Sequence, residues 1–592
     1  MENNATHNDP QHSRDGNDRM MLALLVCLLV AGAIYFALKW LHIRKSQLIE
    51  ASIYLTMFLG SLWSVYVHRA SYKKKALKRK PRLRCRVSAV THERNMEAAF
   101  KKNSVVAGYD ADSRKPVLWS DEVRTMQGIL NGKSGFGKST LMRNLVIQDA
   151  LRTVEIDGEL RHLPIIVFDG KGEEPFADLL IEDLAAMGRL DDVRLLDPSR
   201  PWLSVRYNAL HKGSGETSQE HVNFIFESLG LAKDFFAGHQ VNYFSDLVRV
   251  LEHTGKLYNT YDVLVLAFDP VVLDEQIDLA LWCSENSPGV TVHERLNLQM
   301  SVRNLRESLS DPERVSKIQG LINPLMQFLQ GDLSILTGPY DQLLTLSDVF
   351  DQGLILIVSL NSSVNERAVP ALGRILLKNL QMMVGKRYTR EGRLRGMPMA
   401  SIILDEFYTY AYPTFPRILE TARGSNVSIL FSVQSIAQLD AIGPGFRDHI
   451  TAAPSTIMLM QSWDRPSAEY FRNAAPDREA EQLTVMLEDR GWLDTRYEAS
   501  GRAQSRTVEE PQVSRTQIGS LPRAQMHMLM ASTDGEPRYH HVLVPSPPMA
   551  RVRTFKPTVY PPIPSSNWFS PNGANLRFAE MRRPSRSSGR RR

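Results

Sequence analysis

The chain has 592 residues, of which 43% are hydrophobic and 23% are charged, and its formal net charge is +6. This composition excludes an intrinsically disordered chain, and the length predicts two or three domains. Cys27, Cys85 and Cys283 are too few and too irregularly spaced for a disulfide framework or a cysteine zinc site, which is typical of a cytosolic body. The 15 histidines have no metal-ligand spacing.

Two apolar segments near the N-terminus predict a membrane anchor. Residues 20–38 carry no charge and are long enough to cross a hydrocarbon core of about 30 Å as a helix. Residues 51–67 are shorter but place Trp63 and Tyr66 where interfacial aromatic side chains lie. A cleavable signal peptide is the alternative for the first segment, and its length and the second apolar segment disfavour it. We therefore expect a helical hairpin.

A run of basic residues without an acidic one follows the hairpin: Arg69, Lys73, Lys74, Lys75, Lys78, Arg79, Lys80, Arg82, Arg84 and Arg86. Positive charge marks the cytoplasmic side of a membrane segment, so both termini are predicted to be cytoplasmic. Orientation near anionic lipids is a sufficient explanation for this run, and contact with nucleic acid is an additional one.

A glycine-rich loop between a short apolar stretch and a helical pattern predicts a nucleotide site. Strand, loop and helix follow in the order that a P-loop requires. Backbone amides of such a loop face phosphate oxygens, Lys138 reaches the β- and γ-phosphates, and the Ser139 hydroxyl binds Mg²⁺. The predicted ATP-binding residues are Gly132, Lys133, Ser134, Gly135, Phe136, Gly137, Lys138, Ser139 and Thr140.

Three later strands end in polar side chains that suit the same site. Asp405 and Glu406 follow the apolar residues 400–404, and we expect Asp405 to hold Mg²⁺ and Glu406 to polarise the attacking water. Asp169 follows residues 164–168, and Gln434 follows residues 428–433; ligands gather at this end of parallel strands. An acidic surface turn at Asp405 and ordinary loop positions for Asp169 and Gln434 are the alternatives.

The long interval between Lys138 and Asp405 predicts an inserted domain. Apolar residues within 213–348 recur at helical spacing, and we interpret them as core positions of a mostly α region. Examples are Phe244, Leu247, Val248 and Leu251, and Ile318, Leu321, Ile322 and Leu325. The apolar run at 353–360 then resumes the sheet.

These patterns divide the chain into five parts. The N-terminal part, 1–88, holds the anchor and the basic segment. A nucleotide-binding domain spans 89–212 and 349–544, interrupted by the inserted all-α domain at 213–348. The tail, 545–592, is rich in Pro and Arg and is expected to be disordered.

The combined motifs resemble those of the type IV coupling proteins of conjugation and type IV secretion, over most of the chain. The resemblance rests on the anchor, the P-loop, the acidic strand and four further segments: Asp169-Gly170-Lys171-Gly172-Glu173, Leu196-Asp197-Pro198, Arg206-Tyr207-Asn208-Ala209-Leu210 and Ser432-Val433-Gln434-Ser435. Ala209 stands where many members have Pro, and Phe136 where a small residue is common. Neither departure touches a catalytic group.

The resemblance implies an α/β fold: a RecA-like P-loop NTPase domain with an inserted all-α domain and an N-terminal two-helix transmembrane anchor. It further implies a homo-hexamer in the bacterial inner membrane, with several passes. Lys138, Glu406, Gln434 and Arg423 would be catalytic, with Arg423 as an arginine finger that reaches the γ-phosphate of the adjacent subunit. A solvated helical arginine is the alternative for Arg423.

By the same resemblance the function is ATP-driven export of DNA. The expected partners are DNA, single-stranded and bound through its phosphates without regard to sequence, relaxase and relaxosome proteins, and inner-membrane channel components. One alternative is a docking receptor that uses ATP as a conformational switch. Another is a chromosome-partitioning DNA translocase, although no compact DNA-reading domain is predicted after residue 544. A transporter ATPase is disfavoured because its Leu-Ser-Gly-Gly-Gln signature is absent.

Overall fold

The computed structural model describes residues 85, 87–172, 174–211, 217–229, 237–340, 343–361, 365–389, 397–489, 497–532 and 537–547. The chain forms two units, Met1–Leu83 and Arg84–Arg592. The predicted membrane segments at 20–38 and 51–67, the basic run and the tail beyond 547 lie outside the described residues. Within the described ranges, no helix is long and apolar enough to cross a membrane.

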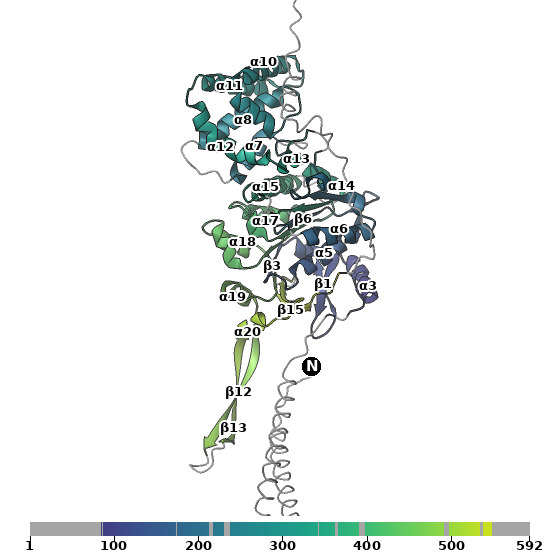
Figure 1. The fold of residues 1–592 in the computed structure, drawn as a ribbon. Coiled ribbons are helices and arrows are strands. Elements are labelled where there is room, and N and C mark those ends of the chain that lie inside the picture. The colour runs from purple at the N-terminus through teal and green to yellow at the C-terminus, as the bar shows by residue number, and fades with distance from the viewer. Residues whose placement is uncertain are drawn as a thin grey trace, which may run out of the picture. The chain divides into compact units, whose positions relative to one another are not determined.

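An 11-stranded sheet forms the centre of the second unit (Figure 1). Its strands are β1 (Ser104–Asp110), β2 (Pro116–Ser120), β3 (Gly128–Asn131), β6 (Ile165–Asp169), β7 (Val193–Leu196), β8 (Ile355–Ser359), β9 (Ala400–Asp405), β10 (Val427–Val433), β11 (Thr456–Leu459), β14 (Gln525–Met530) and β15 (Arg538–Leu543). Their order is β2-β1-β15-β14-β11-β3-β10-β9-β6-β8-β7. Pairing is parallel from β11 to β7 and antiparallel from β11 to β2. The predicted parallel strands are therefore confirmed.

Helices precede, connect and follow these strands. They are α3 (Ala89–Phe100), α4 (Asp121–Arg124), α5 (Lys138–Leu151), α6 (Glu174–Ala186), α14 (Leu346–Gln352), α15 (Ala368–Thr389), α17 (Pro416–Ala422), α18 (Phe446–Ala452), α19 (Arg465–Ala474) and α20 (Arg515–Gly519). Short 3-10 helices are η1 (Leu190–Asp192), η2 (Pro201–Leu203), η3 (Phe407–Thr409) and η4 (Ile436–Ala441).

Helices cover both faces of the parallel strands. In β6, Ile165 and Val167 belong to an apolar cluster that includes residues of α5 and α6. The alternate residues Ile166 and Phe168 belong to the cluster that includes α15 and α17. Successive side chains of a strand point to opposite faces, so a strand covered on both sides needs an unbroken apolar run. This is the pattern seen at 164–168.

The described part of the segment between β7 and β8 is mainly helical, and it contains further helices besides η2 and α14. They are α7 (Ser218–Ser228), α8 (Ala237–His253), α9 (Thr260–Phe268), α10 (Pro270–Asn286), α11 (Val292–Leu309), α12 (Arg314–Phe328) and α13 (Leu333–Thr337). The predicted stripes of α8 and α12 are buried wherever their side chains are described. Capping boxes at Thr217, Asn259 and Thr291 fix where three of these helices begin. The exact domain boundaries stay a prediction.

Two hairpins lie outside the main sheet: β4 (Thr153–Ile156) with β5 (Glu159–His162), and β12 (Asp477–Asp489) with β13 (Tyr497–Pro511). The second is long and projects away from its neighbours α19 and α20 in Figure 1. β13 is rich in charged and small residues and lacks the apolar alternation that identifies a strand in a sequence, whereas β12 has such alternation only at Leu483, Val485 and Leu487.

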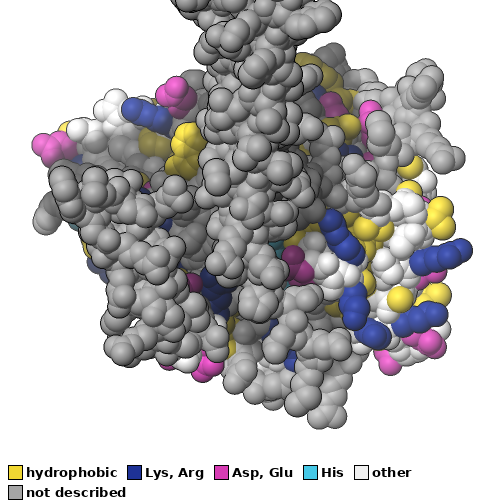
Figure 2. Space-filling view, turned by 90° about the horizontal axis from the view of Figure 1, so that it is seen from below, with side chains coloured by type: hydrophobic (Ala, Val, Ile, Leu, Met, Phe, Trp, Pro, Cys, Tyr) yellow, Lys and Arg dark blue, Asp and Glu magenta, His cyan; other side chains and the backbone are white. Residues whose placement is uncertain are grey.

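The surface of the described part carries both signs of charge. Figure 2 shows Lys and Arg side chains beside Asp and Glu side chains on the face seen there. Exposed ion pairs also place opposite charges side by side, for example Arg306 with Asp278 and Arg447 with Asp440. Interspersed charges produce a weaker long-range field than a patch of one sign. On the face seen in Figure 2, charge alone therefore does not mark a nucleic-acid site.

The antiparallel pair β14–β15 buries a histidine whose ionisation opposes folding. His527 is 4% exposed and shares a 2.8 Å hydrogen bond between Nδ1 and the Tyr539 hydroxyl. Burial, with a smaller contribution from His541, lowers the pKa of His527 to about 3. Because this pKa lies below the ordinary value of about 6.5, the unfolded chain binds more protons, and stability falls as the pH drops from about 6.5 toward 3.

We expect the His527→Gln variant to lose less stability on acidification than the unaltered protein. A single such histidine contributes about 1.4 kcal/mol per pH unit below pH 6.5. Melting temperatures at pH 7.5 and pH 5.5 measure the difference. The exposed His239 of α8 supplies the control, since His239→Gln should leave the acid shift unchanged. Equal acid shifts in both variants would contradict the assignment.

Candidate nucleotide site

Four strand exits meet at one edge of the parallel sheet. The P-loop follows β3, the Asp169 loop follows β6, Glu406 follows β9, and Gln434 follows β10. In the register of β6 with β9, Asp169 lies opposite Asp405. Carboxyl ends of parallel strands form one edge, which is where ligands bind in open α/β sheets. The structure thus brings together residues that are far apart in the sequence.

The P-loop has the geometry of a phosphate cradle. Gly137 adopts a φ of +114°, which glycine tolerates and other residues rarely adopt, and α5 begins at the next residue. Lys138 Nζ donates a 2.6 Å hydrogen bond to the Gly132 carbonyl, across the loop. Phe136 packs against the apolar core, and its carbonyl accepts a 2.9 Å bond from the Ala524 amide. The core contact explains how a large residue fits this loop.

The Lys138 ammonium is buried beside acidic groups. Its side chain is 5% exposed, and its Nζ lies 3.6 Å from Glu406 Oε1. Burial lowers the pKa of Lys138, and the nearby Glu406 and Asp405 carboxylates partly offset this effect. Ser139 and Thr140 follow at the first turn of α5, where both are half-buried. An anion at this helix N-terminus would meet free amides and a lysine.

Glu406 is held in an unusual conformation at the end of β9. Its φ is +47°, a left-handed value that costs a residue with a Cβ roughly 1–2 kcal/mol. The Glu406 amide donates to Asp405 Oδ1 at 3.0 Å and to Ser432 Oγ at 3.2 Å, and the Ser432 hydroxyl also donates to Asp405 Oδ1. Strain that the surroundings enforce in this way is common at functional sites.

The two Glu406 carboxylate oxygens differ in their surroundings. Oε1 accepts a 2.9 Å hydrogen bond from Gln434 Nε2. The same oxygen atom faces the Lys138 ammonium, so Gln434 and Lys138 both contact it. Oε2 is buried and has no hydrogen-bond partner among the residues that the structure describes. A buried carboxylate oxygen without a partner is costly unless a water or a cation satisfies it. The arrangement fits a water poised for proton abstraction next to a Mg²⁺–phosphate group.

Aromatic packing supports the acidic pair from behind. The Tyr410 hydroxyl donates a 2.9 Å hydrogen bond to the Asp405 carbonyl, and burial raises the pKa of Tyr410 well above its ordinary value. Phe407 packs among Tyr410, Phe415 and Phe431. These contacts hold the strand exit rigidly, which keeps the carboxylates in place.

The Asp169 loop brings a residue that the sequence analysis missed. Asp169 is buried, and its Oδ1 accepts a 3.0 Å bond from the Lys171 amide, so this carboxylate shapes the loop. Lys171 Nζ donates a 2.9 Å bond to Ser134 Oγ of the P-loop and lies 3.8 Å from Glu406 Oε1. The sequence did contain a signal that could have identified Lys171: a lysine between two glycines, close after a buried strand.

Comparison with known proteins supports the family resemblance. Residues 400–523 match a family model described as the TraM recognition site of TraD and TraG. The unbound bacterial conjugative coupling protein TrwBdeltaN70 is similar in structure, with a TM-score of 0.52 at 14% identity, covering 77% of this chain and 93% of that chain. No curated protein sequence matches the chain. These findings confirm the resemblance to the type IV coupling proteins.

A second coupling-protein structure gives the same result. The plasmid coupling protein TrwB in complex with a non-hydrolysable GTP analogue has a TM-score of 0.50 at 15% identity, covering 78% of this chain and 94% of that chain. At this identity the likeness concerns the fold, a mixed α/β architecture with a large parallel sheet. The predicted fold class is confirmed to that extent.

Arg423, the arginine finger that the coupling-protein resemblance implies, does not join the site. It caps the C-terminus of α17 and is exposed. Among the residues that the structure describes, its side chain has no hydrogen-bond or ion-pair partner. A residue that serves the site of a neighbouring subunit would have this placement, and so would a solvated arginine.

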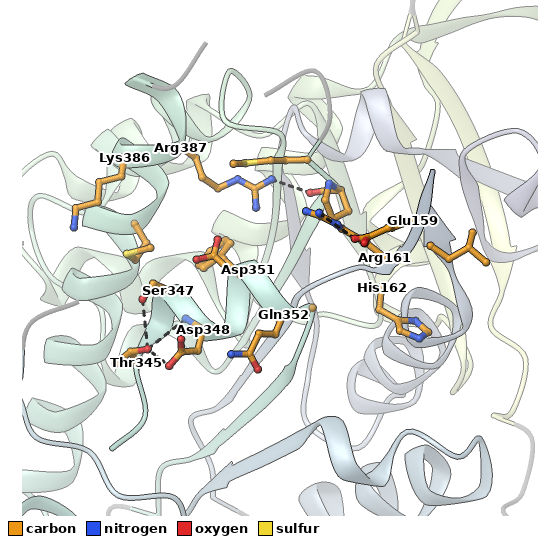
Figure 3. A pocket seen from close by; sticks show the side chains of 16 residues that line it. Glu159, Arg161, His162, Thr345, Ser347, Asp348, Asp351, Gln352, Lys386 and Arg387 are labelled. Atoms are coloured by element: carbon orange, nitrogen blue, oxygen red, sulfur yellow. Dashed lines mark hydrogen bonds and ion pairs between the residues drawn. The ribbon is translucent and has the colours of Figure 1, made fainter. Parts of the chain in front are cut away.

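A separate pocket lies at the opposite edge of the sheet, where β6, β8 and β9 begin (Figure 3). Its volume is about 880 Å³, and side chains of both charges line it. Arg387 donates to the carbonyls of Pro398 and Ser425, while Arg161 pairs with Glu159. Burial lowers the pKa of Arg387 to about 10. Arg387 and Arg161 are thus engaged by the protein itself, and the candidate nucleotide site is the one at the other edge, beside the P-loop.

Proposed function

We propose that the chain is a membrane-anchored ATPase that recruits a relaxase–DNA substrate and drives the DNA into a type IV secretion channel. The proposed ATPase activity rests on one observation: Lys138 and Gln434 both approach Oε1 of Glu406, beside the P-loop. The family match at residues 400–523 supports the coupling part, because its description names a recognition site for a partner protein.

Each group at the site has a role in the proposed hydrolysis. The loop amides and Lys138 bind the phosphates, and Ser139 and Asp405 hold Mg²⁺, which neutralises phosphate charge when bound. Glu406 accepts the proton of the attacking water, and Gln434 orients that water or senses the γ-phosphate. Asp169 acts through the loop that it shapes.

The assembly and its location also belong to the proposal. A homo-hexamer would place Arg423 of each subunit at the site of the next, and the predicted hairpin at 20–67 would hold the ring at the inner membrane with both termini in the cytoplasm. The inserted domain at 213–348 and the matched segment at 400–523 would meet relaxosome proteins, and the membrane side would meet the channel.

The DNA part rests on the family resemblance. On the face seen in Figure 2, Lys and Arg side chains lie beside Asp and Glu side chains, so that face does not argue for DNA by its charge alone. Contacts to phosphates would be independent of sequence and would weaken steeply with salt.

The test measures ATP hydrolysis per subunit against protein concentration, with and without single-stranded DNA. A site shared between subunits predicts that the specific rate rises as the ring assembles, and a pump predicts further stimulation by DNA. A specific rate that depends on neither concentration nor DNA would contradict the proposal.

The match to a recognition segment also favours a second function, a docking receptor in which ATP acts as a conformational switch. The matched residues 400–523 include β9 and β10 and the residues that directly follow them, Glu406 and Gln434, so the matched recognition segment and the nucleotide site overlap. A receptor would bind its partner protein in a nucleotide-dependent manner with little stimulation by DNA. The same rate measurement therefore separates the two functions.

A further inference from the structure

Lys171 is the second lysine of the candidate site, and its loop is built to hold it there. The Gly170 amide donates a 3.1 Å hydrogen bond to the Asp405 carbonyl, and the Lys171 amide donates to Asp169. Gly172 adopts a φ of +59°, and a Cβ at this position would lie 2.2 Å from the Asn361 amide nitrogen. A side chain at 172 would displace the loop, so its path between the exits of β8 and β9 is fixed.

The Lys171 ammonium lies at the P-loop. Lys171 Nζ donates a 2.9 Å hydrogen bond to Ser134 Oγ, whereas the distance from Lys171 Nζ to Glu406 Oε1, 3.8 Å, exceeds hydrogen-bond length. Glu406 already accepts a hydrogen bond from Gln434 and lies near the Lys138 ammonium. Gln434 and Lys138 already hold the Glu406 carboxylate, so this carboxylate does not need Lys171 as a further partner. Lys171 is instead bonded to the P-loop, through Ser134.

The end of the nucleotide that Lys171 faces follows from its neighbours. Lys138 reaches the β- and γ-phosphates of a P-loop ligand, and the general base stands beside the γ-phosphate. The ammonium groups of Lys171 and Lys138 both lie near Oε1 of Glu406. Lys171 comes from the loop after β6, and Lys138 from the P-loop after β3. It therefore stands at the γ-phosphate end of the cradle.

We propose that Lys171 is a second phosphate-binding lysine, which contacts the γ-phosphate of a bound nucleoside triphosphate and so distinguishes the triphosphate from the diphosphate. This rests on the proposed nucleotide-binding function and adds a residue to it. A charge-assisted bond to the γ-phosphate contributes to triphosphate binding and is missing from the diphosphate complex.

The test compares the affinities of a non-hydrolysable ATP analogue and of ADP, each with Mg²⁺, by equilibrium binding to the full-length protein. Lys171→Gln should weaken binding of the triphosphate analogue roughly ten- to hundredfold and leave ADP affinity nearly unchanged. Lys115→Gln makes the same chemical change at an exposed lysine of the β1–β2 turn and should alter neither affinity.

Three outcomes are informative. An unchanged preference for the triphosphate in Lys171→Gln would overturn the inference while leaving the nucleotide site intact. An equal loss of both affinities would also overturn it, because Lys171 would then act only by holding the loop. If the unaltered protein bound neither nucleotide, the proposed function itself would fail.

Discussion

The Glu406→Gln variant is expected to bind ATP and to hydrolyse it roughly 10²–10⁴-fold more slowly than the unaltered protein, the usual contribution of a general base. A glutamine amide fills the same space and cannot accept the proton of the attacking water. Steady-state hydrolysis and equilibrium binding of a non-hydrolysable ATP analogue measure the two properties separately.

The reason that binding should survive lies in the local contacts. The backbone of residue 406 is held through its amide by Asp405 and Ser432, which a change of side chain does not remove. Lys138 keeps its bond to the Gly132 carbonyl. The loss of one negative charge near Lys138 removes an attraction that competes with phosphate, so affinity should stay equal or rise.

Two further variants sharpen this experiment. Lys138→Ala should lose both binding and hydrolysis, because it removes the cation that reaches the phosphates. Glu93→Gln, at an exposed position of α3, should change neither. Undiminished turnover in Glu406→Gln would remove Glu406 from the mechanism, and Asp405 would then be the remaining acidic candidate.

The parallel half of the sheet could be predicted because each strand is covered on both faces. Residues 164–168, 353–360, 400–404 and 428–433 are predominantly apolar stretches interrupted at most by small residues such as serine, and the structure places β6, β8, β9 and β10 there. The convergence of Lys138, Glu406 and Gln434 followed from one rule, that parallel strands present their carboxyl ends at the same edge.

The remaining strands and site residues could not be predicted, because they depend on contacts between residues that are far apart in the sequence. β11 and β14 are short and pair across a long sequence separation, and in the β12–β13 hairpin apolar alternation is confined to residues 483–487. Lys171 belongs to the site because a close approach between Gly172 and Asn361 fixes its loop, a contact that no motif contains. Arg423 is the converse case: the family resemblance implied a catalytic role, but within one subunit this exposed residue does not contact the site.

The Arg423→Ala variant is expected to lose hydrolysis by about 10³-fold or more if Arg423 is an arginine finger. ATP binding within each subunit should persist, since the exposed side chain makes no described contact with the P-loop. Arg417→Ala removes an exposed arginine in the first turn of α17, whereas Arg423 caps the other end of this helix, and it should leave the rate unchanged.

Mixing two inactive variants decides whether Arg423 acts between subunits. In a ring assembled from equal amounts of Arg423→Ala and Glu406→Gln subunits, about a quarter of the interfaces combine an intact Glu406 with an intact Arg423 from the neighbour, by the geometry of a head-to-tail ring. Hydrolysis should therefore recover on mixing, toward about that fraction of the full rate if each interface works independently. If Arg423 served its own subunit, no mixed ring would contain a complete site, and the mixture would stay as inactive as its components.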